Sequence, residues 1–363
     1  MRYLIVVDDF AGGAGNMAQL LAEQLRDEGN NVYVSLTNQR SEPRYYLADI
    51  QLYNTPLSVN NNNKLIALKN MISTADSVIR KAMPDVIISF LNNNNTITCF
   101  ALKKSNTPVI VCERSNPVVV SPKFPWNYLR RIAYKRADAV SVQFDCFKHF
   151  DGGRFEKRCF VTHNIIEKPT TKKEKWQGNK ISFVSLARYN EIKRFGLMIS
   201  LFSDLEKDNS NCELHIFGRG VVNDKLSSVI TECHAENVFL HEAISNVHEE
   251  LTKHDVYLMT SLQEGFPNAL SEGLAVGLPA VVFKCHDGIA DLVQNGVNGF
   301  CVDEGDNSAF VDGMKKLASD ISLRKAFGAE SINIADKYNK ETVINEWHIC
   351  IDSAITHRNR RLL

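Results

Sequence analysis

Short apolar runs alternate with longer amphipathic segments along almost the whole chain, and this alternation constrains the fold more than any other feature. Strands are expected in the first half at residues 3–8, 32–35, 86–90, 109–113, 139–142 and 159–162. Helical patterns lie between them, among them 16–28, 63–81 and 126–135. Because runs of four to six Val and Ile residues suit strands buried on both faces, the pattern predicts a doubly wound α/β domain with a parallel sheet.

Residues 167–179 interrupt the alternation with four Lys, one Pro, one Gly and no branched aliphatic residue. After them it restarts, with strands expected at 180–186, 213–218, 238–241, 256–259, 280–283 and 299–302. A length of 363 residues also suits two domains of about 150–200 residues each. We therefore expect one α/β domain over 1–166, a linker over 167–179, a second domain over 180–340 and a final helix over 341–363.

The formal net charge is zero, with 42 Lys and Arg against 42 Asp and Glu, which argues against a uniformly basic chain built to bind nucleic acid. Residues 1–166 hold 20 basic and 14 acidic side chains, whereas 167–363 hold 22 and 28. We therefore expect the first half to face any anionic surface or substrate. Chance asymmetry between two solvated surfaces is the alternative interpretation.

Several observations predict a cytoplasmic protein that holds no metal ion. The sequence has no run of 18 apolar residues, and its first apolar run ends at Asp8 and Asp9, which favours a buried strand over a signal peptide. The nine cysteines are widely spread without a C-x-x-C pair, which favours free thiols in a reducing compartment. The sequence contains no HExxH motif and no pair of histidines four residues apart, so it indicates no metal site.

The strongest chemical motif runs from Glu264 to Glu272, directly after the strand expected at 256–259. Pro267 suits the first turn of a helix, where its missing N–H costs nothing. The free N–H groups and positive dipole end of such a helix can bind a phosphate. Glu272 would lie about a turn and a half into the helix, within reach of another polar group of the ligand. Alternatively, Glu264 only complements the helix dipole and Glu272 is solvated.

A second motif places two cations after the strand expected at 180–186. Arg188 follows the carboxyl end of this strand, and Lys193 lies five residues later. Ligands of open α/β sheets bind at such strand ends, and an Arg–Lys pair there suits a diphosphate. Two unrelated surface cations are the alternative.

Glycines follow the first expected strand, and residues 13–18 fit the dinucleotide-binding pattern G-x-G-x-x-A. That pattern requires an acidic residue at the end of the second strand, and residues 35–40 supply none. Arg40 is suited to a 2′-phosphate, which keeps an NADP-dependent oxidoreductase as an alternative. The loop is equally suited to close approach by a sugar or another backbone.

Polar residues also follow two adjacent strands of the first domain. Asn92 begins a run of four Asn residues, and Glu113 and Arg114 end the strand expected at 109–113. Such clusters suit hydroxyl-rich ligands. A turn at the Asn run and a local Glu113–Arg114 ion pair are the alternatives.

The helix expected at 126–136 carries aromatic residues beside four cations. This composition suits the interface of an anionic membrane. A surface helix whose aromatic side chains face the core is the alternative.

Taken together, these motifs resemble retaining glycosyltransferase family 4. Residues 264–272 resemble its E-x7-E signature, and Arg188 and Lys193 resemble its Arg…Lys pair. Gly12 and Gly13 resemble its first glycine loop. Further matches are residues 217–220, 277–282 and 295–300, and the resemblance is strongest from about 180 to 345.

The resemblance implies a GT-B fold, with two facing Rossmann-like domains and a final helix that crosses back to the first. Arg188 and Lys193 would bind the donor diphosphate, Glu264 the donor sugar and Glu272 the ribose. The rest of the donor site would comprise Gly218, Gly265, Phe266, Pro267, Asn268 and Ala269. The acceptor side would comprise Gly12, Gly13, Asn92, Glu113 and Arg114.

The family further implies transfer of a hexose or N-acetylhexosamine from a UDP-sugar, with retention of configuration and without a metal. The acceptor would be a saccharide, expected to be lipid-linked, in surface polysaccharide synthesis. This substrate suggests a peripheral location on the cytoplasmic face of the inner membrane, through residues 126–136. A non-catalytic carbohydrate-binding relative is a further alternative.

The chain departs from the family pattern at three points. Arg194 follows Lys193 where the family usually has Gly, and Glu242 replaces another common Gly. The His common in the family's first domain is not evident. These departures concern donor and acceptor identity more than the class of reaction.

Overall fold

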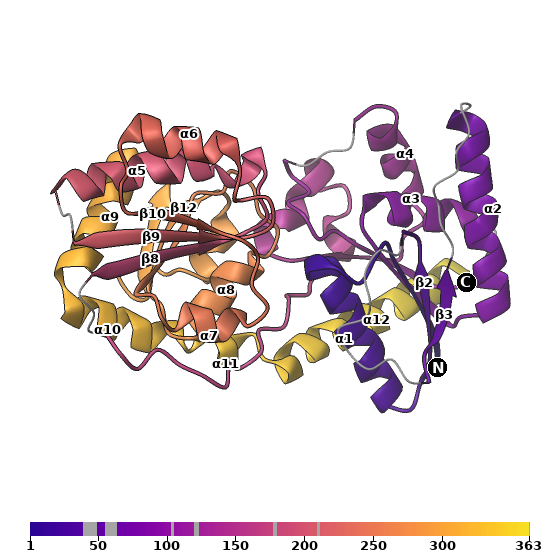
Figure 1. Cartoon of the computed structure of the whole chain (residues 1–363). Coiled ribbons are helices and arrows are strands. Elements are labelled where there is room, and N and C mark those ends of the chain that lie inside the picture. The colour runs from indigo at the N-terminus through magenta and orange to yellow at the C-terminus, as the bar shows by residue number, and fades with distance from the viewer. Residues whose placement is uncertain are drawn as a thin grey trace. The chain divides into compact units, whose positions relative to one another are not determined.

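The computed structural model describes residues 1–38, 49–54, 64–102, 105–119, 123–176, 180–208 and 211–362. The chain forms two compact units. Unit 1 comprises Met1–Ile165 with Glu341–Leu363, and unit 2 comprises Ile166–Lys340. Each unit is built on one parallel sheet with helices packed against it (Figure 1). The α/β class predicted from the alternation of apolar runs is therefore confirmed.

Unit 1 has a seven-stranded sheet in the order β3-β2-β1-β4-β5-β6-β7. Its strands are β1 (Arg2–Val7), β2 (Asn31–Leu36), β3 (Gln51–Asn54), β4 (Val86–Phe90), β5 (Val109–Cys112), β6 (Ala139–Val142) and β7 (Cys159–Val161). Its helices include α1 (Gly12–Asp27), α2 (Lys64–Ala82), α3 (Asn92–Ala101), α4 (Trp126–Ala133) and α12 (Lys340–Leu362), with short 3-10 turns at Asp145–Gly153 and Glu156–Arg158. The order reverses at β1, because the chain winds outward from it in both directions, as in Rossmann-like domains.

The last helix, α12, packs on unit 1 although it follows unit 2 in sequence. Trp347 of α12 is fully buried, and its ring lies 5.9 Å from that of Phe90 in β4. Near the end of the helix, Arg358 donates to Asp138 at 2.9 Å. The predicted return of the final helix to the first domain is therefore confirmed.

Unit 2 has a six-stranded sheet in the order β10-β9-β8-β11-β12-β13. Its strands are β8 (Ile181–Leu186), β9 (Cys212–Phe217), β10 (Val238–His241), β11 (Val256–Met259), β12 (Ala280–Lys284) and β13 (Gly299–Asp303). Its helices include α5 (Phe195–Asp208), α6 (Asp224–Cys233), α7 (Val247–Leu251), α8 (Asn268–Ala275), α9 (Asn307–Ser319), α10 (Ile321–Ser331) and α11 (Ile334–Lys337), with 3-10 turns at Glu191–Lys193 and Asp287–Asp291.

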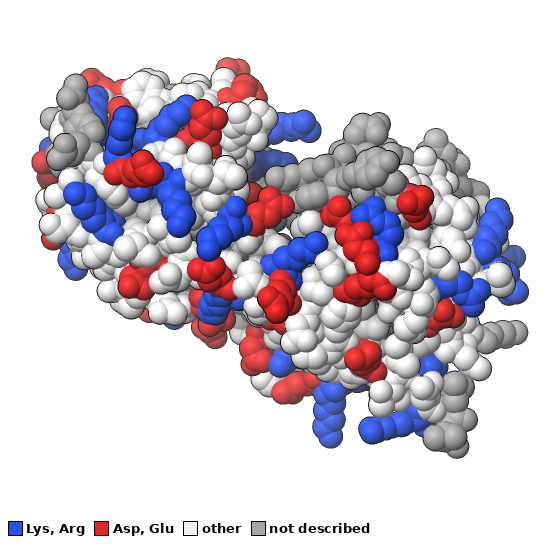
Figure 2. Space-filling model, turned by 90° about the horizontal axis from the view of Figure 1, so that it is seen from below, with Lys and Arg blue, Asp and Glu red and all other residues white. Residues whose placement is uncertain are grey.

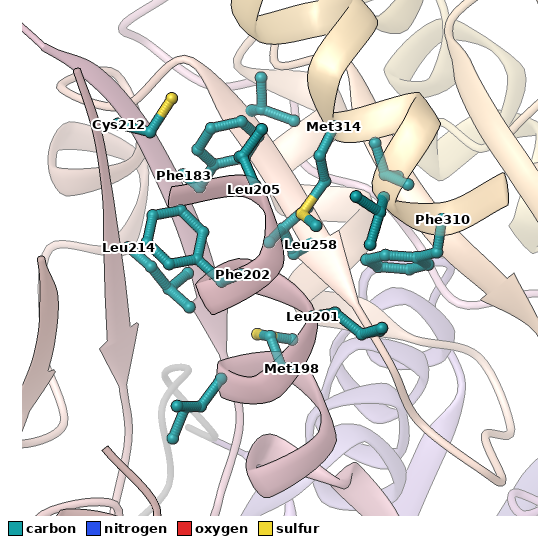
Figure 3. Close-up of a cluster of buried hydrophobic side chains, with 14 of the residues drawn as sticks. Phe183, Met198, Leu201, Phe202, Leu205, Cys212, Leu214, Leu258, Phe310 and Met314 are labelled. Carbon is teal, nitrogen blue, oxygen red and sulfur yellow. The ribbon is translucent and has the colours of Figure 1, made fainter. Parts of the chain in front are cut away.

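A large apolar core lies between the unit 2 sheet and helices α5 and α9 (Figure 3). Phe202 from α5 meets Phe183 of β8, with ring centroids 5.8 Å apart. Phe310 from α9 packs on Phe283 of β12 at 4.5 Å. Helices α7 and α8 cover the opposite face, as Figure 1 shows. Both faces of the sheet are thus covered, which holds the strand ends of this unit in fixed register.

The segment predicted as a linker packs against unit 2 over the part that the structure describes, residues 167–176. The Lys173 amide donates to the Val276 carbonyl at 2.8 Å, and its ammonium lies 3.0 Å from Asp255 Oδ1. Both side chains of this ion pair are at least nine-tenths buried. This part of the segment is therefore packed rather than a free linker, because Lys173 pairs with the buried carboxylate of Asp255.

Three local features differ from the sequence-based expectations. Strand β3 has no apolar run, since its residues are largely exposed at a sheet edge. Helix α1 begins at Gly12, four residues earlier than expected. The Asn run does not form a turn but begins helix α3, where the Asn94 amide donates to the nearby Phe90 O and to the distant Asp8 Oδ1.

Among the helices in the described ranges, none is both long enough and apolar enough to cross a membrane.

Candidate active site

The predicted donor-site residues gather at the carboxyl edge of the unit 2 sheet. Arg188 and Lys193 lie between β8 and α5, Gly218 follows β9, and residues 264–272 follow β11. Parallel strands bring all these connections to one edge of a sheet, where α/β proteins bind ligands. The structure therefore places every predicted donor residue on one continuous edge of unit 2.

An ion pair links two of these connections. The Lys193 ammonium lies 2.6 Å from Glu264 Oε1, and the two side chains are 22% and 11% exposed. The pair is therefore largely shielded, yet it remains open to a ligand. The loops themselves are joined by the Leu262 amide, which donates to the Ile192 carbonyl at 2.8 Å.

Arg188 is exposed, and the backbone on either side of it is held by the connection after β9. Ala187 N donates to Phe217 O at 3.1 Å, and Tyr189 N donates to Arg219 O at 3.0 Å. Between these bonds lies Gly218, with φ +153°, where a Cβ atom would be 1.8 Å from the Ala187 carbonyl oxygen. Only glycine fits here, so the close approach that Gly218 permits positions the Arg188 backbone.

Helix α8 begins at Asn268, and Pro267 is its N-cap residue rather than its first-turn residue. Phe266 is buried, with its ring 5.6 Å from that of Tyr338 in edge-to-face geometry. Gly265, Asn268 and Ala269 are half-buried. The helix start therefore presents backbone N–H groups beside the Lys193–Glu264 pair, while Phe266 anchors the loop from behind.

Tyr257, which the sequence analysis did not single out, lies beneath both carboxylates of the motif. Burial chiefly raises the pKa of its phenol, and the negative charges of Glu272 and Glu264 raise it further. Its hydroxyl donates to Leu186 O at 3.2 Å and accepts from Leu186 N at 3.3 Å. Tyr257 thus joins β11 to the end of β8, and its place in an apolar run gave no signal of this.

Two further residues follow β12 and lie against the Glu264–Gly265 backbone. Burial raises the pKa of the Cys285 thiol to about 12 and lowers that of His286 to about 4, with the Gly265 backbone partly opposing the shift of His286. At neutral pH the thiol is therefore protonated and the imidazole is neutral. A lone Cys-His pair in a strand-end loop carried no motif that sequence analysis could use.

In unit 1, the glycines after β1 form the start of α1. Gly12 is exposed with φ +72°, and Gly13 is half-buried. The glycine that permits close packing is Gly15, the second glycine of the G-x-G-x-x-A pattern, which was not among the predicted site residues: a Cβ atom there would lie 2.4 Å from the Asp9 carbonyl oxygen. Arg40, the residue considered for a 2′-phosphate, lies outside the described residues.

Glu113 lies in a buried polar network at the carboxyl edge of the unit 1 sheet. Its side chain is 1% exposed, it accepts from the Tyr134 hydroxyl at 2.6 Å, and Arg130 lies 3.6 Å away. Burial raises the pKa of Glu113, and the Arg130 charge opposes this. The Asn92 amide nitrogen lies 2.8 Å from Glu113 Oε1 in the orientation that satisfies both groups. Glu113 is therefore too buried to contact an acceptor directly, and it can act on one only by positioning half-buried Asn92 or its other neighbours.

Arg114 is also buried and does not pair with the adjacent Glu113. Its guanidinium donates to the Thr162 carbonyl at 2.7 Å and lies 5.0 Å from the Trp347 ring. Arg114 therefore joins β5, the end of β7 and α12. The local ion pair considered as its alternative role does not form.

Helix α4 has features of both interpretations of residues 126–136, the membrane interface and the surface helix with side chains facing the core. Arg130 and Tyr134 are buried, whereas Phe124, Tyr128 and Ile132 are 83%, 61% and 40% exposed. Tyr128 and Ile132 lie four residues apart in α4 and so share one face of the helix, and Phe124 lies in the turn that precedes it. On the face of the molecule in Figure 2, Lys and Arg are interspersed with Asp and Glu rather than gathered in one basic patch.

The described part of the chain contains no group of three or more His, Cys, Asp and Glu side chains placed to hold a metal ion.

Residues 167–333 match the family model described as glycosyl transferases group 1. Two similar proteins from Campylobacter jejuni subsp. jejuni serotype O:2 have named activities. GalNAc-alpha-(1->4)-GalNAc-alpha-(1->3)-diNAcBac-PP-undecaprenol alpha-1,4-N-acetyl-D-galactosaminyltransferase is 28% identical over 74% of this chain and 75% of its own length. N-acetylgalactosamine-N,N'-diacetylbacillosaminyl-diphospho-undecaprenol 4-alpha-N-acetylgalactosaminyltransferase is 23% identical over 92% of this chain and 95% of its own.

Solved structures show the same fold. Anabaena HepE in complex with UDP has a TM-score of 0.78 at 16% identity, covering 97% of this chain and 100% of its own. The lipopolysaccharide outer core galactosyltransferase WaaB has a TM-score of 0.76 at 16% identity, covering 97% and 99%. The fold is therefore GT-B, and the matches support a glycosyltransferase rather than the oxidoreductase alternative. Residues 167–333, which lie within unit 2, therefore match the family of group 1 glycosyl transferases.

Proposed function

We propose that the protein transfers a hexose or N-acetylhexosamine from a UDP-sugar to a saccharide acceptor, with retention of configuration and without a metal ion. The observation that carries this proposal is the Lys193–Glu264 pair, 2.6 Å apart beside the start of α8. The pair places a cation that can bind phosphate next to a carboxylate that can bind sugar hydroxyl groups, at one edge of the sheet. A nucleotide-sugar presents these two kinds of group next to each other.

The chemistry follows from where charge develops. The bond between the anomeric carbon and the UDP oxygen breaks, and its electrons leave with UDP. Arg188 and Lys193 stabilise the growing negative charge on the diphosphate, and the first N–H groups of α8 add to this. Lys193 has further N–H donors beyond the one that faces Glu264, so phosphate binding does not require the pair to break.

Retention requires the acceptor oxygen to bond the anomeric carbon on the face that UDP leaves. The leaving phosphate oxygen takes the acceptor proton, so this route needs no carboxylate nucleophile. Glu264 binds the donor sugar through its hydroxyl groups, and Glu272 binds the ribose. The fixed cations and the helix end supply the charge stabilisation that a metal gives elsewhere.

For the acceptor, we propose a lipid-linked saccharide in surface polysaccharide synthesis. Support comes from the two Campylobacter relatives, whose names specify undecaprenol-linked substrates. The exposed Phe124, Tyr128 and Ile132 side chains, with Arg131 and Lys135 nearby, suit contact with an anionic membrane surface. We propose that unit 1 meets the cytoplasmic face of the membrane through this segment.

The donor proposal is tested by nucleotide binding followed by turnover. Thermal shifts with UDP, GDP, ADP and their sugars should single out UDP compounds, because a ligand that binds only the folded state raises its stability. Lys193→Ala and Glu264→Ala should each lose transfer, whereas Lys325→Ala, an exposed lysine on α10, should not. Full transfer in both site variants would contradict the donor assignment.

Membrane contact has a separate test. Liposomes containing anionic lipid should bind the protein at low salt, and a double variant, Phe124→Ser with Tyr128→Ser, should bind less. Absence of wild-type binding to such liposomes would refute the membrane part of the proposal and leave the donor part standing.

A further inference from the structure

Arg194, directly after Lys193, adopts a backbone conformation that arginine rarely adopts. Its φ and ψ are +52° and +43°, in the left-handed region, at the end of the 3-10 turn Glu191–Lys193. Glycine takes this conformation without steric strain, whereas a side chain with a Cβ does not. A strained residue persists only where surrounding contacts hold it, so the contacts of Arg194 indicate what the strain maintains.

The Arg194 side chain contacts residues at the ends of three strands of unit 2, β11, β12 and β13. Its Nε donates to the Thr260 carbonyl, after β11, at 2.7 Å. Its terminal nitrogens pair with both carboxylate oxygens of Glu304, after β13, with Nη2 at 2.8 Å from Oε2. The guanidinium also lies 5.4 Å from the ring of Phe283 in β12. Because arginine offers donors in a fixed planar fork, these contacts define one orientation.

The same contacts fix the backbone of Lys193. Thr260 is buried, and its hydroxyl donates to the Lys193 carbonyl at 3.0 Å, while its own carbonyl accepts from Arg194. Thr260 also begins the connection that carries Glu264. The two loops that supply the Lys193–Glu264 pair are therefore joined by the hydrogen bonds between Thr260 and residues 193–194.

We propose that Arg194 is a positioning residue, which holds the Lys193 ammonium at the donor diphosphate by bracing the ends of β8, β11 and β13. This inference rests on the proposed donor role of Lys193. It assigns the unusual arginine a function in donor affinity. Glycine would satisfy the backbone at this position but would provide no brace.

Direct binding of the diphosphate by Arg194 is the competing explanation, and Glu304 separates the two. If Arg194 bound phosphate itself, Glu304→Gln would release its charge and leave UDP affinity equal or higher. If Arg194 acts as a brace, Glu304→Gln loosens the brace and weakens UDP binding. Equal or tighter binding in Glu304→Gln therefore overturns the proposal.

The main test compares Arg194→Gly with His234→Gly. His234 is exposed at the end of α6 and has nearly the same left-handed conformation, with φ +53° and ψ +38°. Both changes relieve backbone strain, but only the first removes the brace. Arg194→Gly should raise the UDP dissociation constant and the donor KM about tenfold or more, with an unchanged acceptor KM, whereas His234→Gly should change none of these. Arg194→Lys should recover part of the loss, since lysine reaches one partner but has no fork.

Melting temperatures of all variants separate binding effects from misfolding. Arg194→Gly with wild-type UDP affinity overturns the positioning role, as does an equal loss in His234→Gly. If wild-type protein binds no UDP, the proposed function fails and the inference fails with it. If wild-type protein binds UDP and Lys193→Ala abolishes binding while Arg194→Gly does not, only the inference fails.

Discussion

The carboxyl edges of the two sheets use charge in opposite ways. In unit 2, the Lys193 and Glu264 side chains are 22% and 11% exposed and lie beside loops that a ligand can reach. In unit 1, Arg130 and Glu113 are 5% and 1% exposed, and a tyrosine hydroxyl also bonds the carboxylate. One edge presents its charges, whereas the other encloses them.

This difference shows that a carboxylate at a strand end of an α/β fold can belong either to a ligand site or to an enclosed structural network. An enclosed ion pair does not by itself add stability, but removing one member leaves the other charged and unsolvated. A partly exposed pair keeps access to water, so loss of one member affects folding little. The same substitution should therefore destabilise unit 1 much more than unit 2.

The largest effect is expected from removing the carboxylates. Glu113→Ala should lower the unfolding free energy by about 3–5 kcal/mol, because Arg130 remains buried without its partner. Glu264→Ala should lower it by less than about 1 kcal/mol, because water replaces the lost contact. Urea unfolding of each variant measures both. Equal losses would break the distinction between the two edges.

The next effect comes from the two glycines that permit close approach, one in each unit. Gly218→Ala and Gly15→Ala would place Cβ atoms 1.8 Å and 2.4 Å from backbone oxygens. Each should cost about 1–3 kcal/mol through displaced backbone. Only Gly218→Ala should also weaken UDP binding, because it shifts the segment that carries Arg188. Calorimetry for stability and UDP titration for affinity check the pair, and loss of UDP affinity in Gly15→Ala would contradict this assignment.

The sequence predicted the strands and the donor edge for related physical reasons. Strands buried on both faces require Val and Ile runs, such as residues 86–90, and parallel strands bring their following loops together. Arg188, Lys193 and Glu264 were therefore predictable as neighbours. Strand β3 was not, because it lies at an edge and needs no apolar run.

The network around Glu113 and the contacts of Arg194 were not predictable from local patterns. Arg130 reaches Glu113 across 17 positions of sequence, and Arg194 reaches Glu304 across 110. Burial of a charge depends on such distant partners, whereas periodicity reports only on neighbours along one element. Tyr257 was missed for the same reason, since it acts by contacting another strand.

Acid should affect the two units with opposite sign. Burial, together with the charges of His215 and Lys173, lowers the pKa of His254 in unit 2 to about 3. Between pH 6.5 and 3, His254 is therefore protonated in the unfolded chain but neutral in the folded chain. Acidification through this range should therefore lower the unfolding free energy of unit 2 by about 1.4 kcal/mol per pH unit. Glu113 has a raised pKa, so its contribution favours folded unit 1 at low pH and is lost as the pH rises through the folded value.

Hydrogen exchange followed by mass spectrometry resolves the two units between pH 7 and pH 5. Peptides from the unit 2 sheet should lose protection on acidification more than those of unit 1, after correction for the intrinsic exchange rate. His254→Asn, which cannot take up the proton, should flatten the unit 2 response. A pH response in unit 2 that survives this substitution would assign it to other groups.

The last comparison concerns two buried tyrosines that join neighbouring strands and helices. Tyr134 donates to the Glu113 carboxylate at 2.6 Å, whereas Tyr257 donates to a neutral carbonyl at 3.2 Å. Hydrogen bonds to charged groups contribute about 1.5–3 kcal/mol and neutral ones about 1 kcal/mol, so Tyr134→Phe should destabilise more than Tyr257→Phe. Tyr257→Phe should nevertheless weaken UDP binding, because its hydroxyl holds the end of β8 near Arg188. Unfolding and UDP titration of both variants decide this: if Tyr134→Phe affects UDP binding as strongly, the donor edge is not independent of the enclosed network in unit 1.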